Sequence, residues 1–419
     1  MALPIWRPIC FNGAMKNALY FQSGGVTAVI GATAAALIKA HRNTSEGRLF
    51  AAEHGLSGLI NNQLVDASAL PEPMRLALSQ LPGGGLGSGR TLLTSYSDNP
   101  EQWHQVRDVL LAHQIGTIYV NGGNGSMDTA AKLVELSDRF SLGLSVIGLP
   151  KTIDNDLEGT DTSPGFGSAL KYLSVSLMEA ARDHCAMATK PSVFILEVMG
   201  RHTGWLATCG AVARLPTQMA SPLILFPEVV FDPACFVAAV QDSFAKHNAC
   251  VCVVSEGIRT ADGQFYAQQN AVARYGHEQL GGAGFAVAQL LREKLSVKVH
   301  VAVPDYLQRA ARHVASATDI EQAEAVATHA VQLVQQGQSG VMVNIVRDAN
   351  QPYAWHCDSV RLADIANRER AFPLGWIDQP AYGITADALS YLQPLIQGEP
   401  HQAWQEGLPE YPWVEWPRV

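Results

Sequence analysis

The feature that most constrains the fold is an alternation of short apolar runs with amphipathic segments along most of the 419 residues. Each run has the pattern of a buried strand, and a polar or glycine-rich loop and a helical pattern follow it. The central example is the run at 145–149, which ends in the charged loop KTIDND at 151–156. This order predicts mainly parallel, right-handed βαβ units and therefore an α/β protein. Ligands of such sheets bind at the carboxyl ends of the strands, so the loops should share one ligand-binding edge.

The same periodicities locate the elements. Strands are expected at 17–22, 48–52, 117–120, 145–149, 194–198, 223–226, 249–254, 297–303 and 340–346. Helices are expected at 28–41, 102–114, from within 160–173 to about 188, and at 283–295 and 321–336. A helix should also begin near Ser126.

The length is too great for one hydrophobic core and predicts two domains. Together with the alternation of strands and helices, the expected architecture is two Rossmann-like lobes with mainly parallel sheets flanked by helices, and the active site is expected between them. The expected division is an extension at 1–14, a lobe at 15–165 to which part of 310–358 returns, a lobe at 166–309, and a C-terminal segment at 359–419 that wraps the surface.

Composition narrows the function. The formal net charge of -9 argues against nucleic-acid binding, because phosphate backbones favour basic surfaces. The apolar stretch at 27–40 is far shorter than a membrane span, so no membrane association is expected. The seven cysteines include no C-x-x-C pair and lie mostly in apolar segments, which indicates buried thiols and a cytoplasmic protein.

Three glycine loops lie in the expected first lobe. They are the turn with Gly24 and Gly25, the loop at 81–90 that ends in Arg90, and NGGNGS at 121–126. Such loops bring backbone N–H groups close to an anion, and together they indicate a polyphosphate or nucleotide donor. Each has a simpler interpretation: a tight turn, a flexible linker, or a helix cap formed by Ser126 or Asp128.

A second set of charges fits an anionic, hydroxylated substrate. It consists of the cations Lys151, Arg201 and Arg309 together with Glu256. Phosphoryl transfer needs in-line placement, cations with Mg²⁺, and a carboxylate that accepts the hydroxyl proton. Asp154 or Asp156 can supply that carboxylate, with the other near the metal ion. A P-loop and the protein-kinase motifs are absent from the sequence.

These motifs together resemble a known family. GGNGS, PKTIDND, TDTSPGFGSA, MGRHTGW, SEG and YLQR occur in the order found in the phosphofructokinases and span roughly residues 16–346. The resemblance implies phosphoryl transfer, with Mg²⁺, to the 1-hydroxyl of fructose 6-phosphate. It also implies a homodimer or homotetramer with the active site near a subunit interface. A neighbouring subunit's cation often completes the site, and Lys298 or His300 is the candidate.

The resemblance also implies residue roles. Asp154 matches the catalytic base, with Lys151 and Arg201 beside it in the reaction. The expected substrate contacts are Thr152, Asp154, Met199, Gly200, Arg201, Glu256, Tyr306 and Arg309. The expected donor contacts are Gly25, Arg90, Gly123, Gly125 and Ser126, and the expected metal ligands are Asn124 and Asp156.

Within the family, two positions bear on the phosphoryl donor. Lys151 resembles the pyrophosphate-dependent members, whereas Gly125 leaves open a space that aspartate usually fills in them. Asn124 also departs from the usual metal-binding aspartate. SGGVTAVI and YLQRA look most like the short pyrophosphate type, so pyrophosphate is the expected donor. The alternatives are an ATP-dependent enzyme and a catalytically silent regulatory subunit of the same fold.

Overall fold

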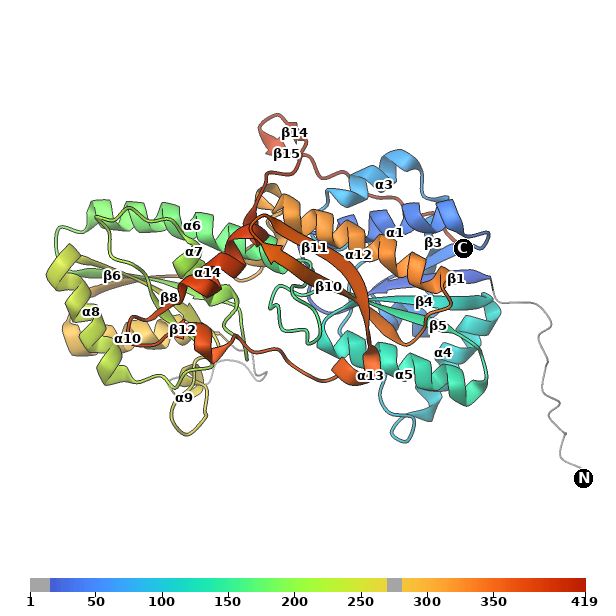
Figure 1. The fold of residues 1–419 in the computed structure, drawn as a ribbon, viewed down its shortest axis with the longest axis horizontal. Helices are drawn as coiled ribbons and strands as arrows, with labels where there is room; N and C mark the ends of the chain where they lie inside the picture. Colours follow the sequence, from blue (N-terminus) through green and yellow to red (C-terminus); the bar gives the residue numbers. More distant parts are fainter. Residues whose placement is uncertain (1–15, 270–280) are drawn as a thin grey trace, which may run out of the picture.

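The computed structural model describes residues 16–269 and 281–419, and they form two α/β halves, each built on its own sheet (Figure 1). The expected extension at 1–14 lies outside the described residues. The larger sheet has the strand order β11-β10-β5-β4-β1-β2-β3. Its strands are β1 (Asn17–Gln22), β2 (Leu49–Ala52), β3 (Leu64–Asp66), β4 (Ile115–Gly122), β5 (Ser145–Pro150), β10 (Val341–Asn350) and β11 (Tyr353–Arg361). Only the edge strands β3 and β11 pair antiparallel, which confirms the prediction of a mainly parallel sheet.

Helices cover both faces of the larger sheet. They are α1 (Ile30–Thr44), α2 (Leu56–Ile60), α3 (Glu72–Ser79), α4 (Pro100–Ala112), α5 (Asn124–Phe140), α12 (Ala317–Gln335) and α13 (Leu362–Ile365). In β1, Ala18 and Tyr20 pack toward α1 and α12, whereas Leu19 and Phe21 pack toward α4 and α5. Because both faces are buried, the strands are continuous apolar runs, and this explains why the sequence located them well.

The smaller half repeats this plan around a fully parallel sheet of order β7-β8-β6-β9. Its strands are β6 (Ser192–Val198), β7 (Leu223–Leu225), β8 (Ala249–Ser255) and β9 (Lys298–Ala302). Its helices are α6 (Phe166–Met187), α7 (Cys209–Val212), α8 (Pro233–His247), α9 (Tyr266–Gln269), α10 (Ala283–Leu295), α11 (Leu307–Ala310) and α14 (Ala386–Leu392). Separate apolar clusters fill its two faces, with α6 and α14 on one and α8 and α10 on the other.

Several expected boundaries were wrong, and a capping residue explains one of the differences. α5 begins at Asn124 and not near Ser126. α12 begins four residues earlier than expected, because the Ser316 side chain accepts a hydrogen bond from the backbone N–H of Asp319. α8 was missed, although the Asp232 side chain caps it and Pro233 opens it.

The C-terminal segment is a mixture of strand, helix and extended chain. Its expected start at 359 falls inside β11, which pairs with β10 along its length. After α13 the chain passes to the smaller half and forms β12 (Ile377–Asp378), β13 (Gly383–Ile384) and α14 (Figure 1). It then forms β14 (Trp404–Gln405) and β15 (Leu408–Pro409) and returns to the larger half, where Arg418 pairs with Glu53.

The structure bears on two expectations from composition, the absence of a membrane span and the burial of the cysteines. In the described part of the chain, no helix has the length and hydropathy needed to cross a membrane. The six described cysteines are free thiols. Cys209, Cys250 and Cys252 are buried, but Cys235 is exposed in the first turn of α8, so the expectation that all are buried was wrong.

Candidate active site

The three glycine loops meet where the order of the larger sheet reverses. β2 and β3 follow on one side of β1, and β4 and β5 lie on the other, so a crevice opens between the carboxyl ends of β1 and β4. Across it the backbone N–H of Ser23 donates to Asn121 O at 2.9 Å. The N–H of Gly24 donates to Gly89 O at 2.9 Å, which brings the loop at 81–90 alongside. The three glycine loops therefore lie side by side at the carboxyl edge of this sheet.

Lys151 lies beneath the first of these loops. It is 2% exposed, and its ammonium donates to Ser23 O at 2.8 Å and to Gly25 O. Burial lowers the pKa of Lys151 to about 8, Asp154 opposes this shift, and the charges of Arg309 and Arg90 add to it. An ammonium has three donors, so one N–H remains after these two contacts for a ligand above the turn.

Asp154 lies three residues further along the same loop. Its side chain is partly exposed, and it contacts Thr152, whose hydroxyl accepts from Asp154 N at 3.1 Å and donates to the carboxylate at 3.4 Å. Burial by the surrounding protein raises the pKa of Asp154 to about 7, and the carboxylates of Asp156 and Glu256 add to the increase, against the effect of Lys151. A carboxylate with a pKa close to neutral is well matched to accepting a hydroxyl proton.

Asn124 and Asp156 form a pair that can hold a cation. The Asn124 amide donates to an Asp156 carboxylate oxygen at 3.0 Å. This contact leaves Asn124 Oδ1 and Asp156 Oδ1 buried without a hydrogen-bond partner. Unpartnered buried oxygens are rare in proteins, and hard divalent cations prefer oxygen ligands. No three Asp, Glu, His or Cys side chains gather as a metal cluster among the described residues, so a Mg²⁺ ion would take its other ligands from phosphate and water.

The smaller half contributes the loops after β6, β8 and β9. Met199 N donates to Gln308 Oε1 at 3.1 Å, and Gly200 N donates to Glu256 Oε1 at 3.3 Å. Gly200 has a φ of +136°, and a Cβ there would lie 2.4 Å from Thr203 O, so only glycine fits. These contacts hold the MGR turn, the glutamate and the YLQR turn together at the carboxyl edge of the second sheet.

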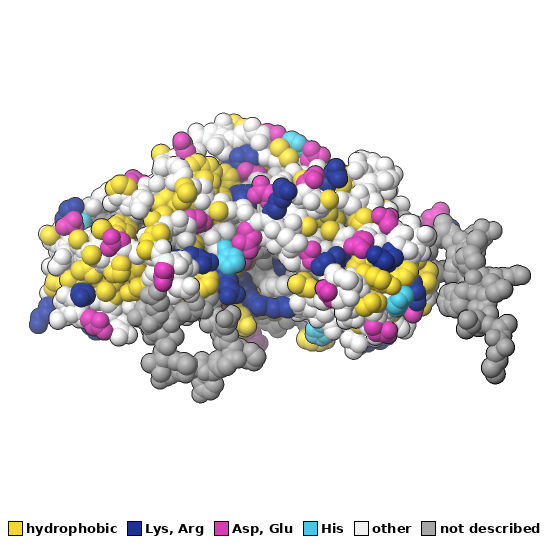
Figure 2. Space-filling view, turned by 90° about the horizontal axis from the view of Figure 1, so that it is seen from below, with side chains coloured by type: hydrophobic (Ala, Val, Ile, Leu, Met, Phe, Trp, Pro, Cys, Tyr) yellow, Lys and Arg dark blue, Asp and Glu magenta, His cyan; other side chains and the backbone are white. Residues whose placement is uncertain are grey.

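Arg309 from the second half approaches the first glycine loop of the larger half. A Cβ built on Gly25 would lie 3.1 Å from Arg309 Nη1, so these loops approach each other closely. The Arg309 guanidinium stacks on the ring of Tyr306, which is 62% exposed, at 4.0 Å. Arg201 is exposed, with its guanidinium 5.6 Å from the Phe265 ring. Figure 2 shows basic side chains gathered around a hollow between the two halves, which suits anionic ligands.

The remaining expected donor contacts lie around the start of α5. Gly123 precedes the helix, and a Cβ there would lie 3.7 Å from Lys151 O. Ser126 is 3% exposed and packs against Gly122. A Cβ on Gly125 would lie 3.3 Å from the side chain of Leu92, which is 44% exposed.

Lys298 and His300 lie elsewhere. Lys298 begins β9 and pairs with Ser192, the first residue of β6, at the amino end of the second sheet. Because Arg309 follows the carboxyl end of β9, Lys298 is at the opposite end of the sheet from this chain's own site. His300 faces His184, with the ring centroids 6.1 Å apart. Neither residue is therefore brought to the candidate site of its own chain.

Sequence reasoning missed two groups of residues that contact the site loops. Gln308 is 2% exposed and hydrogen-bonds to both Met199 N and Asp305 O. It was given no role, although it lies within the YLQR motif. Glu369 and Arg370 lie in the C-terminal segment, where no motif or periodicity marks them. The N–H of Arg370 donates to Asp156 O at 2.8 Å.

A two-sheet α/β fold with this loop set defines a class of phosphotransferases. Residues 17–334 match the sequence profile of the family described as Phosphofructokinase, and the chain belongs to that family.

Two curated relatives and one solved structure are named as pyrophosphate-dependent enzymes. The chain is 43% identical over 401 residues to the pyrophosphate–fructose 6-phosphate 1-phosphotransferase of Methylococcus capsulatus, which covers 95% of this chain and 96% of the relative. It is 45% identical over 398 residues to the enzyme of the same name from Xanthomonas campestris pv. campestris, with 94% and 95% covered. The crystal structure of the pyrophosphate-dependent phosphofructokinase from Nitrosospira multiformis superposes with a TM-score of 0.88 at 41% identity, covering 96% of this chain and 97% of that one.

Proposed function

We propose that this protein transfers a phosphoryl group from pyrophosphate to the 1-hydroxyl of fructose 6-phosphate, giving fructose 1,6-bisphosphate in a reversible step of glycolysis. The observation that carries the proposal is the pair formed by Asp154, a carboxylate with a pKa of about 7, and the buried cation Lys151 beneath the glycine loops. Asp154 accepts the proton of the attacking hydroxyl, and Lys151 stabilises charge on the departing phosphate. Retention of both groups argues against a catalytically silent subunit.

The surroundings of Gly125 bear on the ATP alternative. The missing side chain leaves room beside the donor loops, but the Leu92 side chain lies within 3.3 Å of the position of a Cβ on Gly125. Leu92 therefore borders this space with hydrocarbon, which offers nothing to a further charged phosphate. The hydrocarbon border supports pyrophosphate as the donor, in agreement with the names of the relatives from Methylococcus capsulatus and Xanthomonas campestris.

Asn124 and Asp156 are the residues that would hold Mg²⁺, through the two oxygens that have no partner. When bound, the ion would neutralise charge on the donor oxygens. Asn124 brings no charge of its own, so Asp156 and the donor would carry the electrostatic part of the binding. Burial raises the pKa of Asp156, and a cation beside it would favour its ionised form.

The proposed sugar contacts are Thr152, Met199, Gly200, Arg201, Glu256, Tyr306 and Arg309. Arg201 and Arg309 bind the 6-phosphate, since guanidinium groups match phosphate oxygens. The assembly is a homodimer or homotetramer in the cytoplasm, in which Lys298 or His300 reaches a partner's site. Light scattering on the purified protein would measure its size.

The donor assay tests the proposal directly. With fructose 6-phosphate and Mg²⁺, we expect turnover with pyrophosphate at least about 100-fold faster than with ATP, a difference of roughly 3 kcal/mol in transition-state stabilisation. Chelation of Mg²⁺ should abolish turnover with pyrophosphate. Faster turnover with ATP would establish the ATP-dependent alternative, and no turnover with either donor would establish a silent subunit.

The two shifted pKa values predict a narrow pH optimum between about 7 and 8. Asp154 must be ionised to accept a proton, so turnover should fall as the pH decreases through about 7. Lys151 must be charged, so turnover should also fall as the pH increases through about 8. The profile of kcat/KM for fructose 6-phosphate measures both limbs. A plateau extending from pH 5 to 10 would contradict both roles.

A further inference from the structure

A short strap from the C-terminal segment, residues 369–372, lies against the loop that carries the catalytic aspartate. It lies outside the part of the chain that matches the family profile, residues 17–334. Glu369 forms an antiparallel bridge with Leu157, and the N–H of Arg370 donates to Asp156 O at 2.8 Å. The strap thus pairs with the loop immediately after Asp154.

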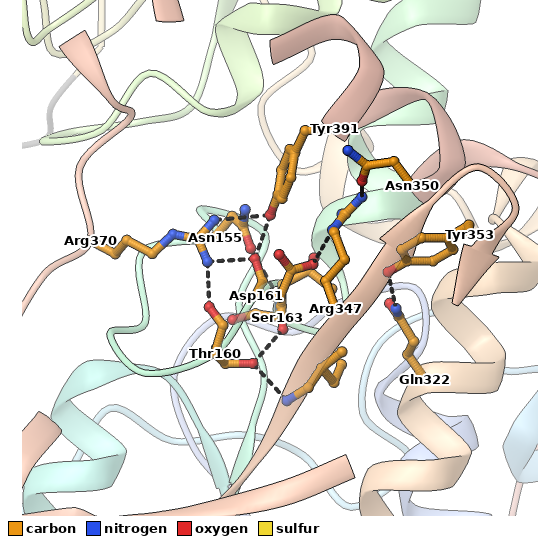
Figure 3. Close-up of polar contacts among 12 residues, drawn as sticks. Asn155, Thr160, Asp161, Ser163, Gln322, Arg347, Asn350, Tyr353, Arg370 and Tyr391 are labelled. Atoms are coloured by element: carbon orange, nitrogen blue, oxygen red, sulfur yellow. Dashed lines mark hydrogen bonds and ion pairs between the residues drawn. The ribbon is translucent and has the colours of Figure 1, made fainter. Parts of the chain in front are cut away.

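The Arg370 side chain then reaches the far end of the same loop (Figure 3). One guanidinium nitrogen, Nη1, donates to Thr160 O and Asp161 O, and the other, Nη2, donates to the Tyr391 hydroxyl at 3.0 Å. The Tyr391 hydroxyl in turn donates to Asp161 O. The guanidinium lies 4.3 Å from the centre of the Trp205 ring. Arg370 forms no ion pair within the described ranges. Its charged guanidinium group instead donates hydrogen bonds to the backbone carbonyl groups of Thr160 and Asp161.

The strap also contacts the turn at 199–205 in the smaller half, which carries the proposed substrate contacts and is called the substrate turn below. The Trp205 indole donates to Arg370 O at 3.1 Å. Glu228 Oε1 accepts from Gly204 N at 2.8 Å and from Phe372 N at 2.9 Å. Two reaction loops from different sheets, at 151–161 and 199–205, are therefore bonded to the same four residues.

We propose that Arg370 is a positioning residue that sets the place of Asp154 relative to the substrate turn. This inference rests on the proposed function. The backbone N–H and the guanidinium of Arg370 hold the loop at Asp156, Thr160 and Asp161, all of which follow Asp154 in the chain. A fork of N–H donors suits several carbonyl groups at once, whereas a lysine would offer one point charge.

The position of these contacts predicts which kinetic constant changes. The Arg370 side chain contacts neither Glu256 nor Arg309, so sugar binding should persist without it. The loop that carries Asp154 would lose two hydrogen bonds from the guanidinium, at Thr160 O and Asp161 O, and the bond to the Tyr391 hydroxyl would be lost as well. A displacement of about 1 Å in a reacting group can lower a rate by roughly 100-fold.

The test compares four variants. Arg370→Met should lower kcat by about 30- to 100-fold and change KM for fructose 6-phosphate by less than about threefold. Arg370→Lys should recover part of the rate. Tyr391→Phe, which removes one hydroxyl, should lower kcat by a smaller factor of about 3 to 10. The matched control is Arg368→Met, because Arg368 is an exposed arginine two residues away and has no side-chain partner among the described residues.

Chemical rescue distinguishes a positioning role of Arg370 from a loss of activity caused by misfolding of the variant. Arg370, Trp205, Tyr391 and Asp161 line a cavity of about 590 Å³, through which a small guanidinium compound can reach the vacated site. Adding ethylguanidinium to Arg370→Ala should raise kcat at least about fivefold, without raising that of Arg368→Met.

Three outcomes would overturn the proposal: an unchanged kcat in Arg370→Met, an effect confined to KM, or a loss fully explained by a smaller folded fraction without rescue. If Arg370→Met does not fold, Tyr391→Phe and Arg370→Lys decide by the same criteria. Wild-type turnover tests the proposed function, whereas the ratio of variant to wild type tests the strap, so the two can fail separately.

Discussion

Replacing Asp154 by alanine is expected to lower turnover roughly 1000-fold, within the range for general acid–base catalysis, while fructose 6-phosphate still binds. The reason is that Asp154 is the proposed base, a carboxylate with a pKa of about 7, whereas the proposed contacts to the sugar phosphate come from the smaller half. Steady-state kcat and calorimetric binding of fructose 6-phosphate measure the two effects separately. Asp154→Asn should lose the same activity, because an amide keeps the shape and cannot accept the proton.

The matched control is Glu158→Ala. Glu158 is exposed on the same loop, and no hydrogen bond or ion pair engages its side chain in the described structure. It should retain wild-type turnover. An Asp154→Ala protein with more than about a tenth of wild-type activity would exclude Asp154 as the base.

The Asp154 variants should also be more stable than the wild type at neutral and higher pH. The folded protein raises the pKa of Asp154 above its value of 3.8, so ionisation costs folding free energy. This cost is absent below about pH 4, and it grows as the pH rises toward about 7. A higher Tm for Asp154→Asn at pH 8 than at pH 4, relative to wild type, would show that the loss of activity does not come from unfolding.

The sequence supported prediction of the fold because local patterns and the tertiary structure agree in most elements. β1 occupies the expected residues Asn17–Gln22, since both of its faces are buried and every residue in the run is constrained by packing. α10 likewise occupies Ala283–Leu295 as expected. The glycine loops could be placed at one edge from topology alone, because parallel strands share their carboxyl end.

The rest depends on contacts between distant segments. Arg370 lies in a stretch without periodicity, and its partners at 156, 160, 161 and 391 become neighbours only in the folded chain. No prediction was made for Leu92, which follows the expected loop at 81–90, and its proximity to Gly125 is a contact between segments distant in the sequence. The unpartnered oxygens of Asn124 and Asp156 were likewise hidden, because they arise from one specific hydrogen bond.

Lys151→Met is expected to lower turnover with pyrophosphate by roughly 100- to 1000-fold, the cost of removing one well-placed electrostatic group from a transition state. Methionine fills most of the buried volume, so the variant removes the charge and the donors to Ser23 O and Gly25 O without opening a large cavity. The fall should appear mainly in kcat, because the charge on the departing phosphate develops in the transition state.

Lys151→Met should also affect stability, through two opposing effects. The folded protein lowers the pKa of Lys151 to about 8, so holding the charge below that pH costs folding free energy, and methionine removes this cost. Methionine also leaves Ser23 O and Gly25 O without their donor, which lowers stability. The matched control is Lys190→Met, because Lys190 is exposed in the turn before β6 and has no partner among the described residues. Its turnover and its Tm should match those of the wild type. If Lys151→Met keeps wild-type kcat with pyrophosphate at pH 7, the cation takes no part in phosphate departure, and the argument for pyrophosphate as donor loses its chemical basis.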